Sequence, residues 1–221
     1  MNKLFIVANL KSNQNEIEAK NWLEEFKKIK DLGQFLDEKE VIICPSFTLL
    51  SLFSRFFKEN NLPIKVGAQN VSPFSEGAYT GEVNAKQVKE FADYVLIGHS
   101  ERRSNFKESD DMLLNKVKTS LEQALIPIYC VQDKDILVPE GVSILAYEPT
   151  FAIGSGNPDT PENADDVARF IKTKGNYQVL YGGSVTPKNV KSFTDKENLS
   201  GVLVGGATLD PNEFIKIIQN A

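Results

Sequence analysis

Eight short apolar runs, rich in β-branched residues, recur along the 221 residues of this chain. They are Leu4–Leu10, Glu40–Pro45, Ile64–Gln69, Tyr94–His99, Ile126–Gln132, Ser143–Glu148, Tyr177–Gly183 and Gly201–Gly206. Most are continuously apolar rather than alternating, which is typical of strands buried on both faces of a parallel sheet. Segments with helical period separate most of the runs. Eight such units in this length favour an α/β fold closed into a (β/α)₈ barrel over an open doubly wound sheet.

Two of the intervening segments carry an apolar stripe on one helical face. The stripes consist of Ala19, Trp22, Leu23, Phe26 and Ile29, and of Leu114, Val117, Leu121 and Ala124. Several residues also predict where helices begin. Capping residues precede helical segments at Ser109 and, with a proline directly after the cap, at Thr160, Thr186 and Asp210.

One connection is short for this scheme. A parallel crossover needs about a dozen residues, enough for one helix and its turns, and the interval from Gln132 to Val142 is barely that long. Pro139 and Gly141 also interrupt it. We therefore expect the helix between strands five and six to be shortened or missing. The sequence contains no linker, low-complexity tract or charge block, so we predict a single barrel domain over residues 1–221.

Composition limits the partners of the chain. The formal net charge of −5 and the isoelectric point near 5.1 argue against a nucleic-acid partner, although they allow a local site for an anion. The apolar run over residues 4–8 is too short for a signal peptide, and no segment approaches a membrane span. Cys44 and Cys130 each lie in an apolar run, which predicts buried free thiols. A cytoplasmic protein without a membrane partner is the expectation.

Polar residues and glycines stand at the ends of several predicted strands. They are Asn9 and Lys11, then His99, Ser100 and Glu101, then Glu148, then Gly182, Gly183 and Ser184, and finally Gly205 and Gly206. In a (β/α)₈ barrel the C-terminal ends of the strands converge on one mouth. We therefore expect these residues to surround a common site.

Glu148 is the candidate base of this site. The segment after it, from Pro149 to Asp159, contains Gly154 and Gly156, which can offer backbone N–H groups to an anion and move as a lid. The alternative is a strand-end carboxylate that caps a neighbouring helix, with glycines that only turn the chain. His99, the one histidine of the chain, is likewise either a hydrogen-bonded structural residue or a catalyst.

The glycine pairs at the seventh and eighth strand ends favour a phosphate site over simple tight turns. Glycine lets the backbone approach an oxyanion, and the loops after these two strands frequently bind phosphate in this fold. Lys11 is directed into the mouth, where a cation would stabilise a developing oxyanion. No His/Cys cluster has metal-ligand spacing, and the first and sixth strand ends lack a dinucleotide-binding glycine motif, so neither metal nor cofactor is expected. The residues together predict abstraction of a proton α to a carbonyl on a small phosphorylated substrate.

Seven motifs, in order along nearly the whole chain, resemble those of the triosephosphate isomerase family. They are Asn9–Asn13, Gly67–Asn70, Gly77–Glu82, Ile97–Arg103, Ala146–Gly156, Tyr181–Ser184 and Val204–Ala207. The resemblance implies a TIM barrel and an intramolecular oxidoreductase, an aldose–ketose isomerase. Such an enzyme interconverts dihydroxyacetone phosphate and D-glyceraldehyde 3-phosphate in glycolysis and gluconeogenesis, without a cofactor.

The resemblance also implies a role for each matching residue. Glu148 would move a proton between two substrate carbons, and a neutral His99 would polarise the carbonyl and relay protons between its oxygens. Lys11 would stabilise the enediolate, and Asn9 would help to orient the site.

Further residues would bind and support the substrate. Ser100 and Glu101 would support the site, and the segment from Pro149 to Asp159 would be the lid. Backbone N–H groups would hold the phosphate near Gly154, Ser184, Gly205 and Gly206. The loop Asn70–Glu82 resembles the dimer loop of the family, which places a threonine, here Thr80, beside the partner's lysine and histidine, so a homodimer is implied.

The chain departs from the family pattern at several positions. Gln132-Asp133 replaces the usual Gly-Glu after the fifth strand, and Pro158 stands in the far hinge of the lid, where proline fixes φ. Phe151 replaces a tryptophan of the first hinge, and Ser200 replaces an acidic residue. Two rival interpretations stay open: another phosphosugar isomerase or epimerase on the same barrel, and a non-catalytic barrel that binds phosphorylated metabolites.

Overall fold

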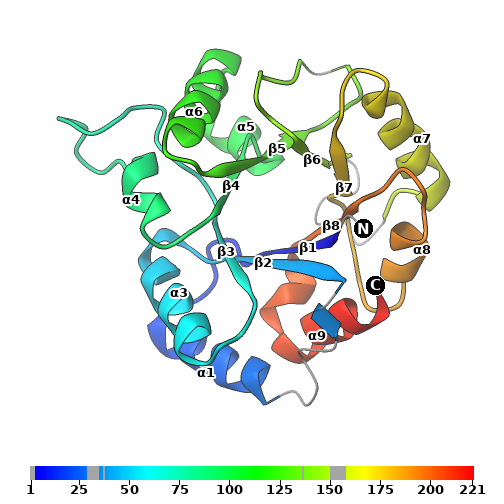
Figure 1. Cartoon of the computed structure of the whole chain (residues 1–221), viewed down its shortest axis with the longest axis horizontal. Coiled ribbons are helices and arrows are strands. Elements are labelled where there is room, and N and C mark those ends of the chain that lie inside the picture. Colours follow the sequence, from blue (N-terminus) through cyan, green and yellow to red (C-terminus); the bar gives the residue numbers. More distant parts are fainter. Residues whose placement is uncertain (1–2, 29–34, 37, 136, 150–157) are drawn as a thin grey trace.

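The computed structural model describes residues 3–28, 35–36, 38–135, 137–149 and 158–221. Eight parallel strands pair in the order of the sequence, and the last pairs with the first to close a barrel, which Figure 1 shows as the central ring. The strands are β1 (Leu4–Asn9), β2 (Lys39–Cys44), β3 (Lys65–Ala68), β4 (Tyr94–Ile97), β5 (Ile126–Val131), β6 (Ile144–Tyr147), β7 (Gln178–Tyr181) and β8 (Gly201–Val204). The predicted (β/α)₈ barrel is confirmed.

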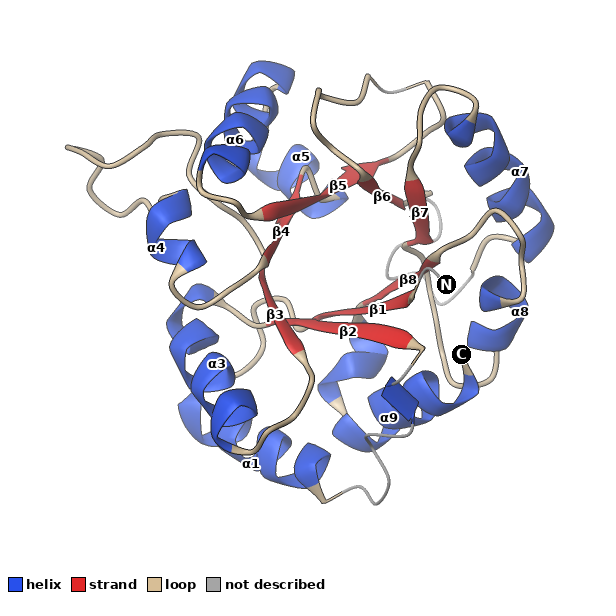
Figure 2. Ribbon diagram, in the orientation of Figure 1, coloured by secondary structure: helices blue, strands red, loops and turns tan. Residues whose placement is uncertain are grey.

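Helices surround the barrel, as Figure 2 shows. They are α1 (Glu16–Lys27), α3 (Leu50–Glu59), α4 (Ala85–Lys89), α5 (Ser100–Phe106), α6 (Asp110–Glu122), α7 (Pro161–Lys172), α8 (Val190–Thr194) and α9 (Pro211–Asn220), with the short 3₁₀ helices η1 (Phe47–Leu49) and η2 (Gly206–Leu209). Across the described ranges, no helix combines the length and apolar character needed to cross a membrane.

The core has two layers because successive strand residues point to opposite faces of the sheet. One set of side chains fills the inside of the barrel and includes Val7, Ile42, Cys44 and Cys130, whereas the other packs between strands and helices. Both cysteines are buried and free, as predicted. The predicted runs extend beyond several strands at their C-terminal ends, since residues such as His99 and Glu148 stay buried at the mouth after the strand has ended.

The connection from β5 to β6 contains no helix over its described residues, 132–135 and 137–143, as the sequence predicted. These described residues form turns, bends and irregular backbone. Lys174 anchors the connection, because the Nζ atom donates to the carbonyl of Lys134 at 2.7 Å and lies 3.5 Å from Oδ1 of Asp135.

The apolar stripe predicted for the helix now seen as α6 was wrong. Leu114, Leu121 and Ala124 are exposed, and of that stripe only Val117 is buried. The buried face consists instead of Leu113, Lys116, Val117 and Ser120. The helix can bury Lys116 because its ammonium group pairs with the carboxylate of Glu108. By contrast, the predicted face of α1 is confirmed for Ala19, Trp22, Leu23 and Phe26, whereas Ile29 lies outside the described residues.

Three of the four predicted caps are confirmed. Ser109, Thr160 and Asp210 each accept a backbone N–H bond at the start of α6, α7 and α9. Thr186 is the exception: residues 187–189 form a turn, and α8 begins only at Val190. The Thr186 N–H donates to Oδ1 of Asn189 at 2.7 Å, which stabilises this turn.

Candidate active site

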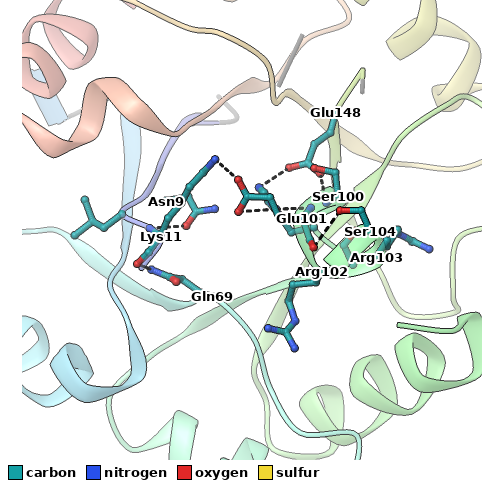
Figure 3. Close-up of polar contacts among 12 residues, drawn as sticks. Asn9, Lys11, Gln69, Ser100, Glu101, Arg102, Arg103, Ser104 and Glu148 are labelled. Carbon is teal, nitrogen blue, oxygen red and sulfur yellow. Dashed lines mark hydrogen bonds and ion pairs between the residues drawn. The ribbon is translucent and has the colours of Figure 1, made fainter. Parts of the chain in front are cut away.

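Nine of the residues expected to surround the site line one cavity of about 280 Å³ at the C-terminal mouth of the barrel. They are Asn9, Lys11, His99, Glu148, Gly182, Gly183, Ser184, Gly205 and Gly206. They come from the ends of β1, β4, β6, β7 and β8, so closure of the barrel brings together residues that lie far apart in the sequence. Figure 3 shows polar residues of this mouth from β1, α5 and β6 facing one another.

His99 has a defined tautomer in this site. It caps the N-terminus of α5, where its Nδ1 accepts the N–H of Glu101 at 3.2 Å. Because Nδ1 accepts a hydrogen bond, the neutral ring carries its proton on Nε2. Nε2 lies 3.1 Å from Oε1 of Glu148, toward which it donates. The imidazole is thus arranged as a neutral hydrogen-bond donor to the mouth.

Glu148 directly follows β6 and is 1% exposed. Its Oε2 accepts the backbone N–H of Ser100 at 2.9 Å, at the first residue of α5. Burial raises the pKa of the Glu148 carboxyl above its ordinary value of 4.5, while His99 and the hydrogen bonds that the carboxylate accepts partly offset this effect. A raised pKa in a cavity brings a carboxylate closer to the range useful for a general base.

Lys11 has an unusual backbone conformation, with φ at 53°. Its N–H donates to Oδ1 of Asn9 at 3.1 Å. Its ammonium group pairs with the carboxylate of Glu101, and Figure 3 shows these two side chains pointing toward each other. Glu101 thus lies beside Lys11, and its supporting role stays a prediction.

Glycines form the wall opposite His99. A Cβ atom at Gly205 would lie 3.2 Å from Cε of Lys11, whereas one at Gly206 would meet nothing within 4 Å. Gly206 begins η2, and it lines the cavity with Ser184. The backbone at this wall is thus open to an oxyanion of the kind that glycine-rich strand ends bind.

Among the predicted site residues that the structure describes, Ser100, Glu101 and Thr80 do not line the cavity. Thr80 is exposed in the loop between β3 and α4, which Figure 1 shows projecting away from the barrel. Gly154 lies outside the described residues, as do Phe151, Gly156 and most of the segment predicted to be a lid.

Sequence reasoning missed two residues around the site. Gln69 donates to the carbonyl of Lys11, and Gln132 donates to Oε2 of Glu148 at 3.4 Å. A signal existed in the alternation of β5, since Ile128 and Cys130 point into the barrel and Gln132 continues the same face. Among the residues that the structure describes, no cluster of His, Cys, Asp and Glu side chains is arranged to hold a metal ion.

Comparison with known proteins identifies similar sequences along the whole chain. The family model described as triosephosphate isomerase matches residues 4–142 and 138–221, and the two matches meet in the β5–β6 connection. A triosephosphate isomerase of Dictyoglomus turgidum is 36% identical over 254 aligned positions, which cover 100% of both chains. Those of Mesomycoplasma hyopneumoniae strain 232 and Aquifex aeolicus are 35% and 36% identical, covering 99% and 97% of this chain and 100% and 98% of their own.

Proposed function

Because the chain belongs to the triosephosphate isomerase family, we propose that Glu148, His99 and Lys11 carry out the reaction of that family in the cavity described above. The chain is an aldose–ketose isomerase that interconverts dihydroxyacetone phosphate and D-glyceraldehyde 3-phosphate. The observation that carries the assignment of roles is the convergence of a buried carboxylate, a neutral imidazole and an ammonium group on one small cavity.

Glu148 is the base that moves the proton. Its carboxylate removes a proton from the carbon next to the substrate carbonyl, and the C–H electron pair forms a carbon–carbon double bond while the carbonyl electrons move onto oxygen. The resulting enediolate is reprotonated by the same carboxyl group on the neighbouring carbon. One carbon is oxidised and the next is reduced, so the reaction balances without an external oxidant or cofactor.

The developing oxyanion is stabilised by two groups. The Nε2–H of His99 donates to the carbonyl oxygen and passes its proton between the two substrate oxygens, a role supported by the bond from Glu101 N–H to Nδ1. The ammonium group of Lys11 supplies a fixed positive charge, and Asn9 orients it through the Lys11 N–H. Glu101 and Ser100 support the lysine and the base, respectively.

The phosphate is bound at the glycine wall. Ser184, Gly205 and Gly206 line the cavity opposite His99, and their backbone N–H groups are the proposed ligands, together with Gly154 on the strength of the family motif. The open space around Gly206 supports this placement.

A homodimer completes the site in this proposal. The loop Asn70–Glu82 is exposed around Thr80, and it carries a stacked aromatic pair, Phe74 and Tyr79. Their ring centroids lie 4.3 Å apart, and the two residues are 46% and 44% exposed. Rigid, exposed aromatic side chains are favoured at protein interfaces. The loop would enter the partner and place Thr80 beside its lysine and histidine. Sedimentation velocity of the wild type and of Tyr79→Asp tests this, since the substitution should shift dimer to monomer.

The cellular setting follows from the activity. We place the enzyme in glycolysis and gluconeogenesis in the cytoplasm, and the phosphorylated triose is its small-molecule partner. A coupled assay on pure protein, run in both directions and at several protein concentrations, tests the activity and its dependence on the dimer. Activity on a longer sugar phosphate that exceeds activity on the triose would instead indicate another phosphosugar isomerase or epimerase.

A further inference from the structure

The side-chain amide of Gln69 joins the ends of two neighbouring strands below the active site. Gln69 follows β3, and its Nε2 donates to the backbone carbonyl of Lys11 at 2.9 Å and to that of Cys44 at 2.8 Å. An amide nitrogen carries two protons, so both hydrogen bonds form at once. Figure 3 shows the Gln69 side chain next to the backbone of Lys11.

The bond to Lys11 acts on a strained residue. A φ of 53° lies in the left-handed region, which residues other than glycine, asparagine and aspartate rarely adopt. Such a conformation persists only when the surroundings hold it in place. Here side chains hold both backbone polar groups of Lys11: Asn9 accepts its N–H, and Gln69 donates to its carbonyl.

This backbone conformation determines where the ammonium group lies. From it the Lys11 side chain extends along Gly205, where a Cβ atom would come within 3.2 Å of Cε, and reaches Glu101 on the far side of the mouth. If the carbonyl lost its donor, Lys11 could relax to an ordinary negative φ. The Cα–Cβ bond of Lys11 would then point in a different direction, and the ammonium group would move away from its present position.

We propose that Gln69 is a positioning residue for the isomerisation, whose amide locks the left-handed backbone of Lys11 and thereby places the ammonium group over the reacting oxygen. The proposal rests on the role of Lys11 proposed above. Gln69 does not line the cavity, so it acts on the reaction through Lys11, and its second bond holds the carbonyl of Cys44 at the end of β2. A misplacement of a catalytic group by about 1 Å can reduce the rate by about 10²-fold, so the effect should be large relative to the size of the change.

The test replaces Gln69 by methionine, which keeps the length of the side chain and removes both donors. We expect kcat/KM to fall roughly 10- to 100-fold, and a crystal structure of the variant to show Lys11 with a negative φ. Gln69→Glu serves as a second variant of the same shape if the first fails to fold. The matched control is Asn60→Leu, which removes an amide that donates to the carbonyl of Phe56 at 2.8 Å away from the cavity. Its kcat/KM should stay within about twofold of the wild type.

A double-mutant cycle separates positioning from a general structural role. In a Lys11→Met background, adding Gln69→Met should lower kcat/KM no further. A loss that multiplies in that background, or a Gln69→Met enzyme with wild-type kcat/KM, would overturn the positioning role and leave the proposed function intact. A Lys11→Met enzyme with wild-type kcat/KM would overturn the role of Lys11, and that of Gln69 with it.

Discussion

Nε2 of His99 lies 3.1 Å from Oε1 of Glu148, although the two residues follow strands that are not neighbours in the barrel. Nε2 is the donor of this contact and the Glu148 carboxyl group is the acceptor, because Nδ1 of His99 already accepts the N–H of Glu101. The electrophile and the base of the proposed reaction therefore face the same small volume. A substrate that engages both groups must take the place of this contact.

Replacement of Glu148 by glutamine should abolish most of the activity. The amide keeps the size of the side chain and can still accept the Ser100 N–H, but it cannot accept a proton from carbon. General base catalysis contributes about 10²- to 10⁴-fold, so kcat should fall by at least that much with little change in KM. The measurement is the coupled assay in both directions, with Glu162→Gln, in an exposed pair with Lys196, as the control. Wild-type turnover by Glu148→Gln would refute the assignment of the base.

The raised pKa of Glu148 should appear in the pH dependence of stability. Burial favours the protonated carboxyl in the folded state, so its pKa is higher there than in the unfolded chain. The stability that this group contributes is complete below the unfolded pKa and is lost as the pH rises through the folded pKa. Glu148→Gln cannot ionise, so its stability relative to the wild type should increase across this window.

Urea unfolding of both proteins between about pH 4 and pH 8 measures this difference without substrate, whose phosphate group itself titrates near pH 6 or so. A constant stability difference across the range would mean that burial does not control the ionisation of Glu148.

The barrel and the site were predictable from the sequence for the same physical reason. Residues that alternate along a strand share one face, and Ile144 and Ala146 face the interior just before Glu148. Once eight parallel strands close, the next inward residue must lie in the mouth. Glu148 and Lys11, which continues the inward face of Val7, could therefore be placed together without knowing any contact between them. His99 is one position off the inward face of Tyr94 and Leu96, and it follows Gly98, whose φ is 73°.

Other features depend on contacts that a pattern cannot show. The face of α6 was predicted wrongly because Lys116 counts as polar in any periodicity, although its pairing with Glu108 allows it to be buried. Gln69 was missed as part of the site because its role comes from hydrogen bonds across strands, whereas Gln132 could have been found from the alternation of β5. The role of Thr80 stays a prediction, since it concerns a second chain.

Two glycines of the site should respond differently to alanine. A Cβ atom at Gly183 would lie 2.1 Å from Oη of Tyr181, a fully buried ring stacked on Phe193, so the backbone or the ring must move. Overpacking of this kind costs about 1–3 kcal/mol of unfolding free energy. Gly206→Ala meets nothing within 4 Å and should keep its stability, but its methyl group enters the proposed phosphate site and should raise KM.

Urea unfolding and steady-state kinetics of the two alanine variants distinguish these effects. The expected pattern is a lower unfolding midpoint for Gly183→Ala and a higher KM at unchanged midpoint for Gly206→Ala. Equal KM values for Gly206→Ala and the wild type would remove Gly206 from the phosphate site.

The buried charges behind α5 should be unequal in their effect on stability. Glu108 and Lys116 pair with side chains that are each 2% exposed, and Nε of Arg102 also lies 2.6 Å from Oε1 of Glu108. Removing the acid leaves Lys116 buried beside Arg102 with a single neutral partner, Asn70, at 2.6 Å. Loss of one member of a buried pair costs about 3–5 kcal/mol, so Glu108→Leu should lose an amount in this range.

Lys116→Met should cost less than Glu108→Leu, because Arg102 still neutralises the remaining carboxylate and methionine follows the path of the lysine side chain. Urea unfolding at one fixed protein concentration gives both values, and the fixed concentration is needed because dissociation of a dimer would contribute to the transition. Equal losses would show that Arg102 contributes nothing to the burial of Glu108. A larger loss of unfolding free energy for Lys116→Met would mean that the ammonium group of Lys116 contributes more to stability than the carboxylate of Glu108.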